Sequence, residues 1–223
     1  MKKILIVVGA RPNFMKVAPL MRALKNNGGF ETILVHTGQH YDKKMSEVFF
    51  NDLEIPQPDF NLNVGSGSHS IQTARIMEKF EEVCVQSIPD LVLVVGDVNS
   101  TMACTIVAKK LHIEVAHIEA GLRSNDRNMP EEINRLVTDS ISDYFFVTEK
   151  SGELNLIKEG HSDSKIFFSG NLMIDSLHFG LKKISGNNVP IKGEYGLITL
   201  HRPSNVDNIE NLKNILEGLS NIA

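Results

Sequence analysis

The sequence predicts an α/β fold built on a doubly wound parallel sheet with helices on both faces. Short apolar runs alternate with longer stretches of helical periodicity along most of the chain, which is the order of strands and crossover helices. The apolar runs are nearly continuous, as in strands that are buried on both faces. The 223-residue chain is 42% apolar and 22% charged, so it can bury a sizeable core.

Six apolar runs are expected to form the strands of a first lobe. These strands are predicted at residues 4–8, 32–36, 91–95, 115–118, 144–147 and 166–168. The first run resembles the start of a signal peptide, but it is short and Arg11 interrupts it, so we interpret it as a buried strand. Between the second and third runs, the helical spacing of Ile71, Phe80 and Cys84 predicts a helix.

The stretch SGNNVPIKG at residues 185–193 predicts a linker, because Gly, Asn and Pro cluster there after a long helical pattern. We therefore expect the first lobe to span residues 1–184. Residues 194–223 are expected to begin a second lobe, with a strand at 195–200 and a helix at 208–222. One strand and one helix cannot close a core of their own. The sequence therefore predicts a chain truncated after its first lobe, or one whose last unit packs on another chain.

Composition excludes several classes of function. The net charge of −4, without a basic stripe, fits a small charged metabolite better than a nucleic acid. No run reaches the roughly 20 apolar residues of a membrane span. Cys84 and Cys104 lie in apolar helical patterns without metal-ligand spacing, which indicates buried reduced thiols. We expect a cytoplasmic protein without a metal site and without a disulfide framework.

Polar side chains follow the predicted strands where each strand ends. In an open α/β sheet, ligands bind beyond the carboxyl ends of the strands, so these residues are the candidates for a functional site. The candidates are Arg11, Lys16, Asp97, Glu119, Glu131 and His201.

Arg11 and Lys16 follow the first strand, at the start of a predicted helix. Cations at this end oppose the helix dipole, which favours an anion instead. A bound phosphate would remove this conflict, because Arg, Lys and exposed N–H groups together form an anion site. The glycine spacing of a dinucleotide-binding loop is missing, so the prediction is limited to an anion.

The carboxylates differ in how much they need a functional explanation. Asp97 can act at the site or simply cap the following helix, and the sequence leaves both interpretations open. Glu119 comes directly after a buried strand, where a carboxylate is costly unless it has a partner. Glu131 and Glu132 are the weakest candidates, because glutamates beside a first-turn proline suit any stable helix.

Two histidines lie near the same strand ends. His117 is inside a strand, and we interpret it as a hydrogen-bonded core histidine rather than a ligand. His40, in the stretch TGQHYD, is at a strand end and its role stays open. No combination of His, Cys and carboxylate has metal spacing, and no GxSxG nucleophile motif occurs.

Seven motifs, in this order along essentially the whole chain, carry a resemblance to a known family. They are GARPNFMKVAPL, TGQHYD, VVGDVNSTMAC, AHIEAGLRS, MPEEINRLVTD, Gly170-Asn171 and LHRPSNVD. Together they resemble the non-hydrolysing UDP-N-acetylglucosamine 2-epimerases of bacteria and archaea. The resemblance implies a Rossmann-like first lobe of a two-lobed glycosyltransferase-B architecture.

The resemblance also implies roles for the candidate residues. Arg11 and Lys16 are expected on the diphosphate of UDP. Asp97, Glu119 and Glu131 match acid/base carboxylates, and His201 matches a histidine that reaches in from the second lobe. The implied reaction eliminates UDP to give a 2-acetamidoglucal and then adds it back after protonation of C2 from the other face. No cofactor is expected because no net redox change occurs, and the family implies a homodimer.

Three alternatives stay open. A hydrolysing 2-epimerase, acting on UDP-N-acetylglucosamine or on a diacetamido sugar, releases UDP and a free sugar. A glycosyltransferase can share the same two-lobed fold. A lobe without catalytic activity is the third alternative, because the uridine pocket of the family belongs to the part of the second lobe beyond Ala223. The stretch Asn13-Phe14-Met15 also departs from the Glu-containing segment of many bacterial members, which leaves the exact substrate open.

Overall fold

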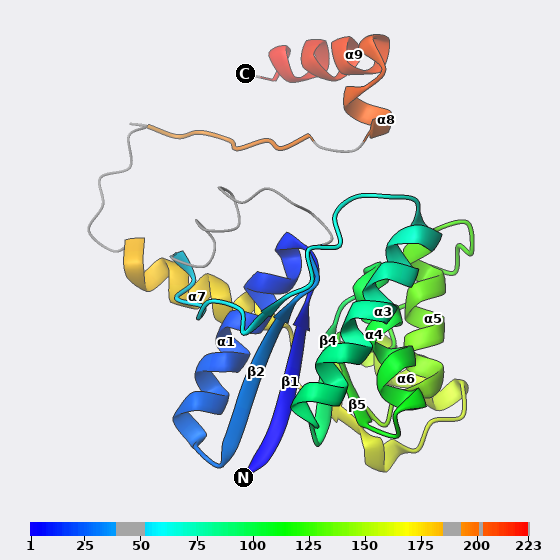
Figure 1. Cartoon of the computed structure of the whole chain (residues 1–223). Helices are drawn as coiled ribbons and strands as arrows, with labels where there is room; N and C mark the ends of the chain where they lie inside the picture. Colours follow the sequence, from blue (N-terminus) through cyan, green and yellow to red (C-terminus); the bar gives the residue numbers. More distant parts are fainter. Residues whose placement is uncertain (39–51, 185–192, 201–202, 223) are drawn as a thin grey trace. The chain divides into compact units, whose positions relative to one another are not determined.

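The computed structural model describes residues 1–38, 52–184, 193–200 and 203–222. The chain divides into two compact units, Met1–Ile184 and Ser185–Ala223. The first unit contains a seven-stranded parallel sheet with helices on both faces (Figure 1). Its strands are β1 (Lys2–Val8), β2 (Phe30–His36), β3 (Phe60–Asn61), β4 (Leu91–Val95), β5 (Glu114–Ile118), β6 (Tyr144–Val147) and β7 (Ile166–Phe168).

The strand order is β3-β2-β1-β4-β5-β6-β7, and every neighbouring pair is parallel. The chain therefore moves outward from β1 in one direction and then returns to β4 to continue in the other. Doubly wound sheets bind ligands beyond the carboxyl ends of the strands at this point of reversal, which here are the ends of β1 and β4. The topology confirms the predicted doubly wound parallel sheet.

The helices of the first unit form two layers around the sheet. They are α1 (Arg11–Asn27), α3 (His69–Ser87), α4 (Asn99–Lys110), α5 (Pro130–Ile141), α6 (Lys150–Lys158) and α7 (Leu172–Ile184). Helices α1 and α7 pack together on one face, and α3, α4 and α5 pack side by side on the other (Figure 1). No helix in the described part of the chain is both long enough and apolar enough to cross a membrane.

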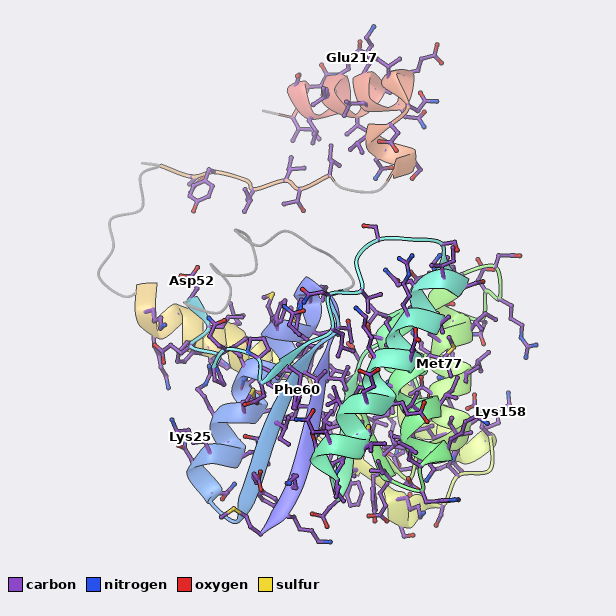
Figure 2. All side chains as sticks on the ribbon, viewed as in Figure 1. Lys25, Asp52, Phe60, Met77, Lys158 and Glu217 are labelled. Carbon is purple, nitrogen blue, oxygen red and sulfur yellow. The ribbon has the colours of Figure 1, made fainter. Side chains whose placement is uncertain are left out.

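Side chains alternate between the two faces along each strand. Leu5 and Val7 of β1 point into one buried cluster, which includes Phe80 of α3. The neighbours of Leu5 and Val7 along β1 point into the other cluster with Phe14 of α1. Phe60 is among the partly buried residues packed against the first cluster (Figure 2). The alternation explains why the strand runs are apolar throughout, since each face needs its own set of side chains.

The six strands predicted for the first lobe are confirmed, and β4, β6 and β7 have the predicted bounds. The two-residue strand β3 was missed, because a run this short shows no periodicity. The strand predicted at 195–200 is wrong: residues 194–200 carry no regular secondary structure. A strand is stabilised by hydrogen bonds to a neighbour, and the described part of the second unit contains no other strand to supply them.

The second unit contains two described helices, α8 (Pro203–Val206) and α9 (Ile209–Ser220). Asn208 caps α9, because its side chain accepts hydrogen bonds from the N–H groups of Glu210 and Asn211. The helix predicted at 208–222 is therefore confirmed, with its ends trimmed to the cap and the last turn. Most of the predicted linker, residues 185–192, lies outside the described residues.

Candidate active site at the strand ends

Asn13 holds the turn between β1 and α1 against the neighbouring strand. Its side-chain carbonyl accepts hydrogen bonds from Gly9 N (3.2 Å) and Ala10 N (3.0 Å), while its amide donates to Val95 O at the end of β4 (2.9 Å). A Cβ added at Gly9 would overlap Ser100 Oγ, so helix α4 also approaches this turn closely. The start of α1 is thereby fixed beside the carboxyl end of β4.

An ion pair joins α1 to the turn after β5. The ammonium group of Lys16, from α1, contacts Glu119 Oε2, from the turn after β5. Both side chains are mostly shielded from solvent, with 14% and 19% of their surfaces exposed. The pair lies against Gly96, because a Cβ there would be 3.4 Å from Glu119 Oε2 and 3.5 Å from Lys16 Nζ. The predicted need of Glu119 for a partner is confirmed, and the partner is Lys16.

The turn that carries Glu119 is strained and tightly packed. Glu119 has φ of +72°, which costs on the order of 1–3 kcal/mol for a residue with a side chain. The N–H groups of Glu119 and Ala120 both donate to Phe146 O on β6, at 2.9 and 3.1 Å. A Cβ at Gly121 would overlap the carbonyl of Gly152, so only glycine fits there. These contacts hold the Glu119 carboxylate over the strand ends.

Asp97 forms an ion pair across the site instead of capping a helix. Its Oδ2 accepts a hydrogen bond from Arg135 Nη2 of α5 at 2.5 Å. The cap of α4 is Val98, and no side chain caps this helix. The capping interpretation of Asp97 is therefore wrong, because its carboxylate faces α5. The backbone carbonyl of Asp97 also accepts a hydrogen bond from Asn134 at 2.8 Å, which fixes the loop to α5.

Glu132 is a buried structural anchor. It is 2% exposed and accepts hydrogen bonds from Ser124 N, Ser124 Oγ, Asn125 N and Arg135 Nη1 at 2.9–3.1 Å. Burial raises the pKa of the Glu132 carboxyl, but the hydrogen bonds from Ser124, Arg135 and Asn125 lower it more, so the net shift is downward. Glu132 thus ties the loop before α5 to the helix and orients Arg135 toward Asp97.

Glu131, its neighbour, has the opposite environment. It is half-buried, and no hydrogen bond or ion pair joins it to the residues that the structure describes. It lines a cavity of about 310 Å³ together with His69, Asn99 and Asn134. The side chains of Asn99 and Asn134 are hydrogen-bonded at 3.2 Å, so the polar wall of the cavity is ordered. Since α3, α4 and α5 begin at this cavity, their N-terminal dipoles favour negative charge there.

His117 is fully buried and hydrogen-bonded on both sides of its ring. Nδ1 lies 2.6 Å from Asp139 Oδ1, and Nε2 lies 2.8 Å from the carbonyl oxygen of Gly96. Asp139 also accepts hydrogen bonds from Gly121 N (3.0 Å) and lies 2.7 Å from Arg123 Nη1. The prediction of a hydrogen-bonded core histidine is confirmed.

Comparison with known proteins identifies the family. The family model described as UDP-N-acetylglucosamine 2-epimerase matches residues 22–223, which is most of the chain. The chain belongs to this family. The resemblance found in the sequence is thus confirmed, and so is the fold class of a Rossmann-like first lobe of the glycosyltransferase-B kind.

The most similar members of the 2-epimerase family include archaeal and bacterial proteins. A UDP-N-acetylglucosamine 2-epimerase homolog of Methanococcus maripaludis is 49% identical over 221 residues, which are 96% of this chain and 61% of the relative. The crystal structure of the Methanocaldococcus jannaschii UDP-GlcNAc 2-epimerase in complex with UDP-GlcNAc and UDP matches with a TM-score of 0.88. It is 45% identical, and the match covers 99% of this chain and 62% of that one.

A UDP-2,3-diacetamido-2,3-dideoxy-D-glucuronate 2-epimerase of Pseudomonas aeruginosa is also similar. It is 43% identical over 223 residues, which are 99% of this chain and 63% of the relative. The chain therefore spans 61–63% of the length of these three relatives. Membership of the 2-epimerase family does not by itself separate the two substrates that these relatives are named for.

Some of the expected 2-epimerase residues lie outside what the structure describes. Arg11 is the first residue of α1, but its side chain is not described, and His40 and His201 fall outside the described residues altogether. Within the described ranges, no group of three or more His, Cys, Asp or Glu side chains is arranged to hold a metal ion. Cys84 and Cys104 are free and buried, as predicted.

Sequence reasoning missed three residues that organise the site, namely Asn13, Arg135 and Asp139. Signals for two of them were present in MPEEINRLVTD, because Arg135 follows Glu132 at the i,i+3 spacing of a helical ion pair. Asp139 lies seven residues after Glu132, close to two helical turns, which returns it to the same buried face. Asn13 gave no comparable signal, since its partner Val95 lies 82 residues later in the sequence, at the end of the neighbouring strand β4.

Proposed function

We propose that this protein is a UDP-N-acetylglucosamine 2-epimerase that interconverts UDP-GlcNAc and UDP-ManNAc through a 2-acetamidoglucal intermediate. The observation that carries the proposal is the convergence of Lys16, Glu119 and Asp97 at the point where the strand order reverses. The similarity to the UDP-N-acetylglucosamine 2-epimerase of Methanocaldococcus jannaschii supports the same reaction.

In the proposed reaction, the bond between C1 and the diphosphate oxygen breaks and UDP leaves with both electrons. The proton on C2 goes to a carboxylate, and the C2–H electrons form the double bond between C1 and C2. Arg11 and Lys16 stabilise the negative charge that develops on the leaving diphosphate. In the return step, UDP attacks C1 and a proton is delivered to C2 from the opposite face.

Inversion at C2 needs two proton-transfer groups on opposite faces of the ring, because one group cannot both remove and return the proton with inversion. The three candidate carboxylates have different environments. Glu119 contacts Lys16, Asp97 contacts Arg135, and Glu131 faces the polar cavity without an ionic partner in the described part of the chain. Such differences suit a division of roles between a group that takes the proton and one that delivers it.

The remaining roles belong to the same proposal. His201 is assigned a role on the substrate by the family resemblance alone. The reaction requires no redox cofactor, because substrate and product have the same oxidation state. A homodimer in the cytoplasm is the form of the protein that the family resemblance favours.

The test is proton NMR of UDP-GlcNAc in deuterated water with the full translated protein. We expect deuterium at C2 and growth of the UDP-ManNAc signals, without free N-acetylmannosamine. Glu131→Gln should slow this exchange by about 100-fold or more, as loss of an acid/base group does. Glu82→Gln, an exposed glutamate of α3, is the matched control and should leave the rate unchanged.

Two outcomes would overturn the non-hydrolysing assignment. Accumulation of UDP with free N-acetylmannosamine would make the protein a hydrolysing 2-epimerase, and absence of any exchange would exclude this substrate. The similarity to the Pseudomonas aeruginosa enzyme favours one second candidate substrate, a UDP-diacetamido sugar acid. Parallel assays with that substrate decide between the two, because the preferred substrate will show the higher kcat/KM.

A further inference from the structure

We propose that His117 and Asp139 form a buried positioning pair that sets the distance between the loop carrying Asp97 and the turn carrying Glu119. The proposal rests on the proposed function, because it gives the two carboxylates their catalytic meaning. Neither His117 nor Asp139 needs to touch the substrate. They act on the backbone segments that place the reacting groups.

The first contact of the pair is with the loop after β4. His117 is in β5 and fully buried, and its Nε2 lies 2.8 Å from the carbonyl oxygen of Gly96. Gly96 directly precedes Asp97 and has φ of +71°, a conformation that favours glycine. The histidine therefore holds the base of the loop that carries Asp97.

The second contact is with the turn after β5. Asp139, on α5, places Oδ1 2.6 Å from His117 Nδ1, and its Oδ2 accepts the N–H of Gly121 at 3.0 Å. Gly121 comes two residues after Glu119, within the strained turn. One chain of hydrogen bonds thus runs from Gly96 through His117 and Asp139 to Gly121, and it joins the two carboxylate-bearing segments.

This hydrogen-bond pattern assigns a proton to each ring nitrogen of His117. A carbonyl oxygen can only accept, so Nε2 must carry a hydrogen. Asp139 is a carboxylate acceptor as well, since its Oδ2 already accepts from Gly121 and faces the guanidinium of Arg123 at 2.7 Å. Burial raises the pKa of Asp139, but His117 and Arg123 lower it more, and the net direction is downward. Nδ1 therefore also donates.

The charges form an alternating row from the interior to the surface. His117 faces Asp139, Asp139 faces Arg123, and Arg123 donates to both oxygens of Glu159 at 2.8 and 2.6 Å. Buried ion pairs add little net stability compared with well-packed apolar side chains, because both charges must be desolvated. Apolar side chains cannot make directional hydrogen bonds to a backbone carbonyl or N–H group. The hydrogen bonds of His117 and Asp139 fix the loop after β4 and the turn after β5 in this way.

The kinetic test separates the two contacts with two substitutions at one position. His117→Asn keeps a donor near Asp139 and loses the contact with Gly96, while His117→Gln keeps a donor near Gly96 and loses the contact with Asp139. We expect kcat for 2-epimerisation by the full translated protein to fall about 10–100-fold in both variants, because misplacement of reacting groups by about 1 Å has this effect. KM should change by less than about 3-fold, since the proposed diphosphate contacts are untouched.

The control is His178→Gln, an exposed histidine of α7, which should leave both constants unchanged. All rates are divided by the folded fraction measured by circular dichroism, so that a loss of activity caused only by unfolding does not count as a lower kcat. If both His117 variants keep kcat within about 3-fold of the unsubstituted protein, the positioning role is refuted.

A second readout does not depend on activity and stays decisive even when the proposed function fails. Nitrogen-15 NMR should show a hydrogen on each ring nitrogen of His117, with the signal assigned by its loss in His117→Gln. The backbone amide signals of Asp97 and Gly121 should shift in the His117 variants and stay in place in His178→Gln. A ring nitrogen without a hydrogen, or amide signals that do not shift in the His117 variants, would refute the positioning pair. If the NMR signals behave as expected but no deuterium exchange occurs at C2, only the proposed function is refuted.

Discussion

Replacement of Glu132 by glutamine tests whether the two adjacent glutamates of α5 have separate roles. Glu132 is 2% exposed, and its two oxygens accept four hydrogen bonds, one of them from Arg135. Glutamine has the same shape but only one acceptor oxygen, so its NH₂ group must face at least one N–H donor of the loop at Ser124 and Asn125. Glu132→Gln therefore removes a charge partner and leaves a buried donor unsatisfied.

The magnitude follows from these contacts. Breaking a buried ion pair from one side costs about 3–5 kcal/mol, and we expect the lower end, about 3 kcal/mol, because Arg135 keeps its second partner Asp97. For a cooperative unit of this size each kcal/mol lowers Tm by about 2–4 °C, so Tm should fall by about 6–12 °C. Glu131→Gln, one residue earlier, should change the free energy of unfolding by less than about 0.5 kcal/mol.

The assay is urea unfolding followed by circular dichroism, at several pH values. The folded-state pKa of Glu132 lies below its unfolded value, so its contribution to stability is present above the unfolded pKa of about 4.3 and is lost as pH falls through the folded pKa. The difference in the free energy of unfolding between the unsubstituted protein and Glu132→Gln should therefore become smaller at acidic pH. A Glu132→Gln variant as stable as Glu131→Gln at neutral pH would refute the reasoning.

Three further predictions test the site. Lys16→Met should lower kcat/KM for UDP-GlcNAc by about 100-fold in the NMR assay, because a cation on the leaving diphosphate is lost; an unchanged value would remove Lys16 from the site. Gly121→Ala should destabilise the protein by more than about 3 kcal/mol in urea unfolding, whereas Gly160→Ala, also at positive φ but with open space around it, should cost only about 1 kcal/mol. Burial raises the pKa of Cys84 to about 12 and that of Cys104 well above its ordinary value, so neither thiol should react with Ellman's reagent before unfolding.

The fold was largely predictable because its strands are buried on both faces. The run at residues 91–95 is apolar throughout, and β4 has the predicted bounds. The same rule led to the wrong strand at residues 195–200, because an apolar run forms a strand only where a neighbouring strand is available for pairing. Apolar side chains indicate that a run can be buried. Whether that run becomes a strand depends on the strands beside it.

The sequence indicated which residues belong to the candidate site, but it did not indicate which of them contact one another. The position of Glu119 after a buried strand indicated a missing partner, but Lys16 is 103 residues away in the sequence. Asp97 and Arg135 are separated by 38 residues, so their contact becomes visible only once α5 is placed beside the loop after β4, and the sequence alone left the helix-cap interpretation open. The predicted role of His201 remains a prediction, because that residue lies outside the described part of the chain.

Because Glu119 contacts Lys16, its carboxylate occupies the ammonium group that is proposed to bind the diphosphate. In the proposed reaction, the diphosphate and the Glu119 carboxylate claim the same ammonium group. Arrival of the nucleotide therefore exchanges one anion for another and releases the carboxylate beside the sugar at the same moment. Under the proposed function, this competition lowers the affinity for the substrate, and the Glu119 carboxylate is freed from Lys16 only when a substrate is bound.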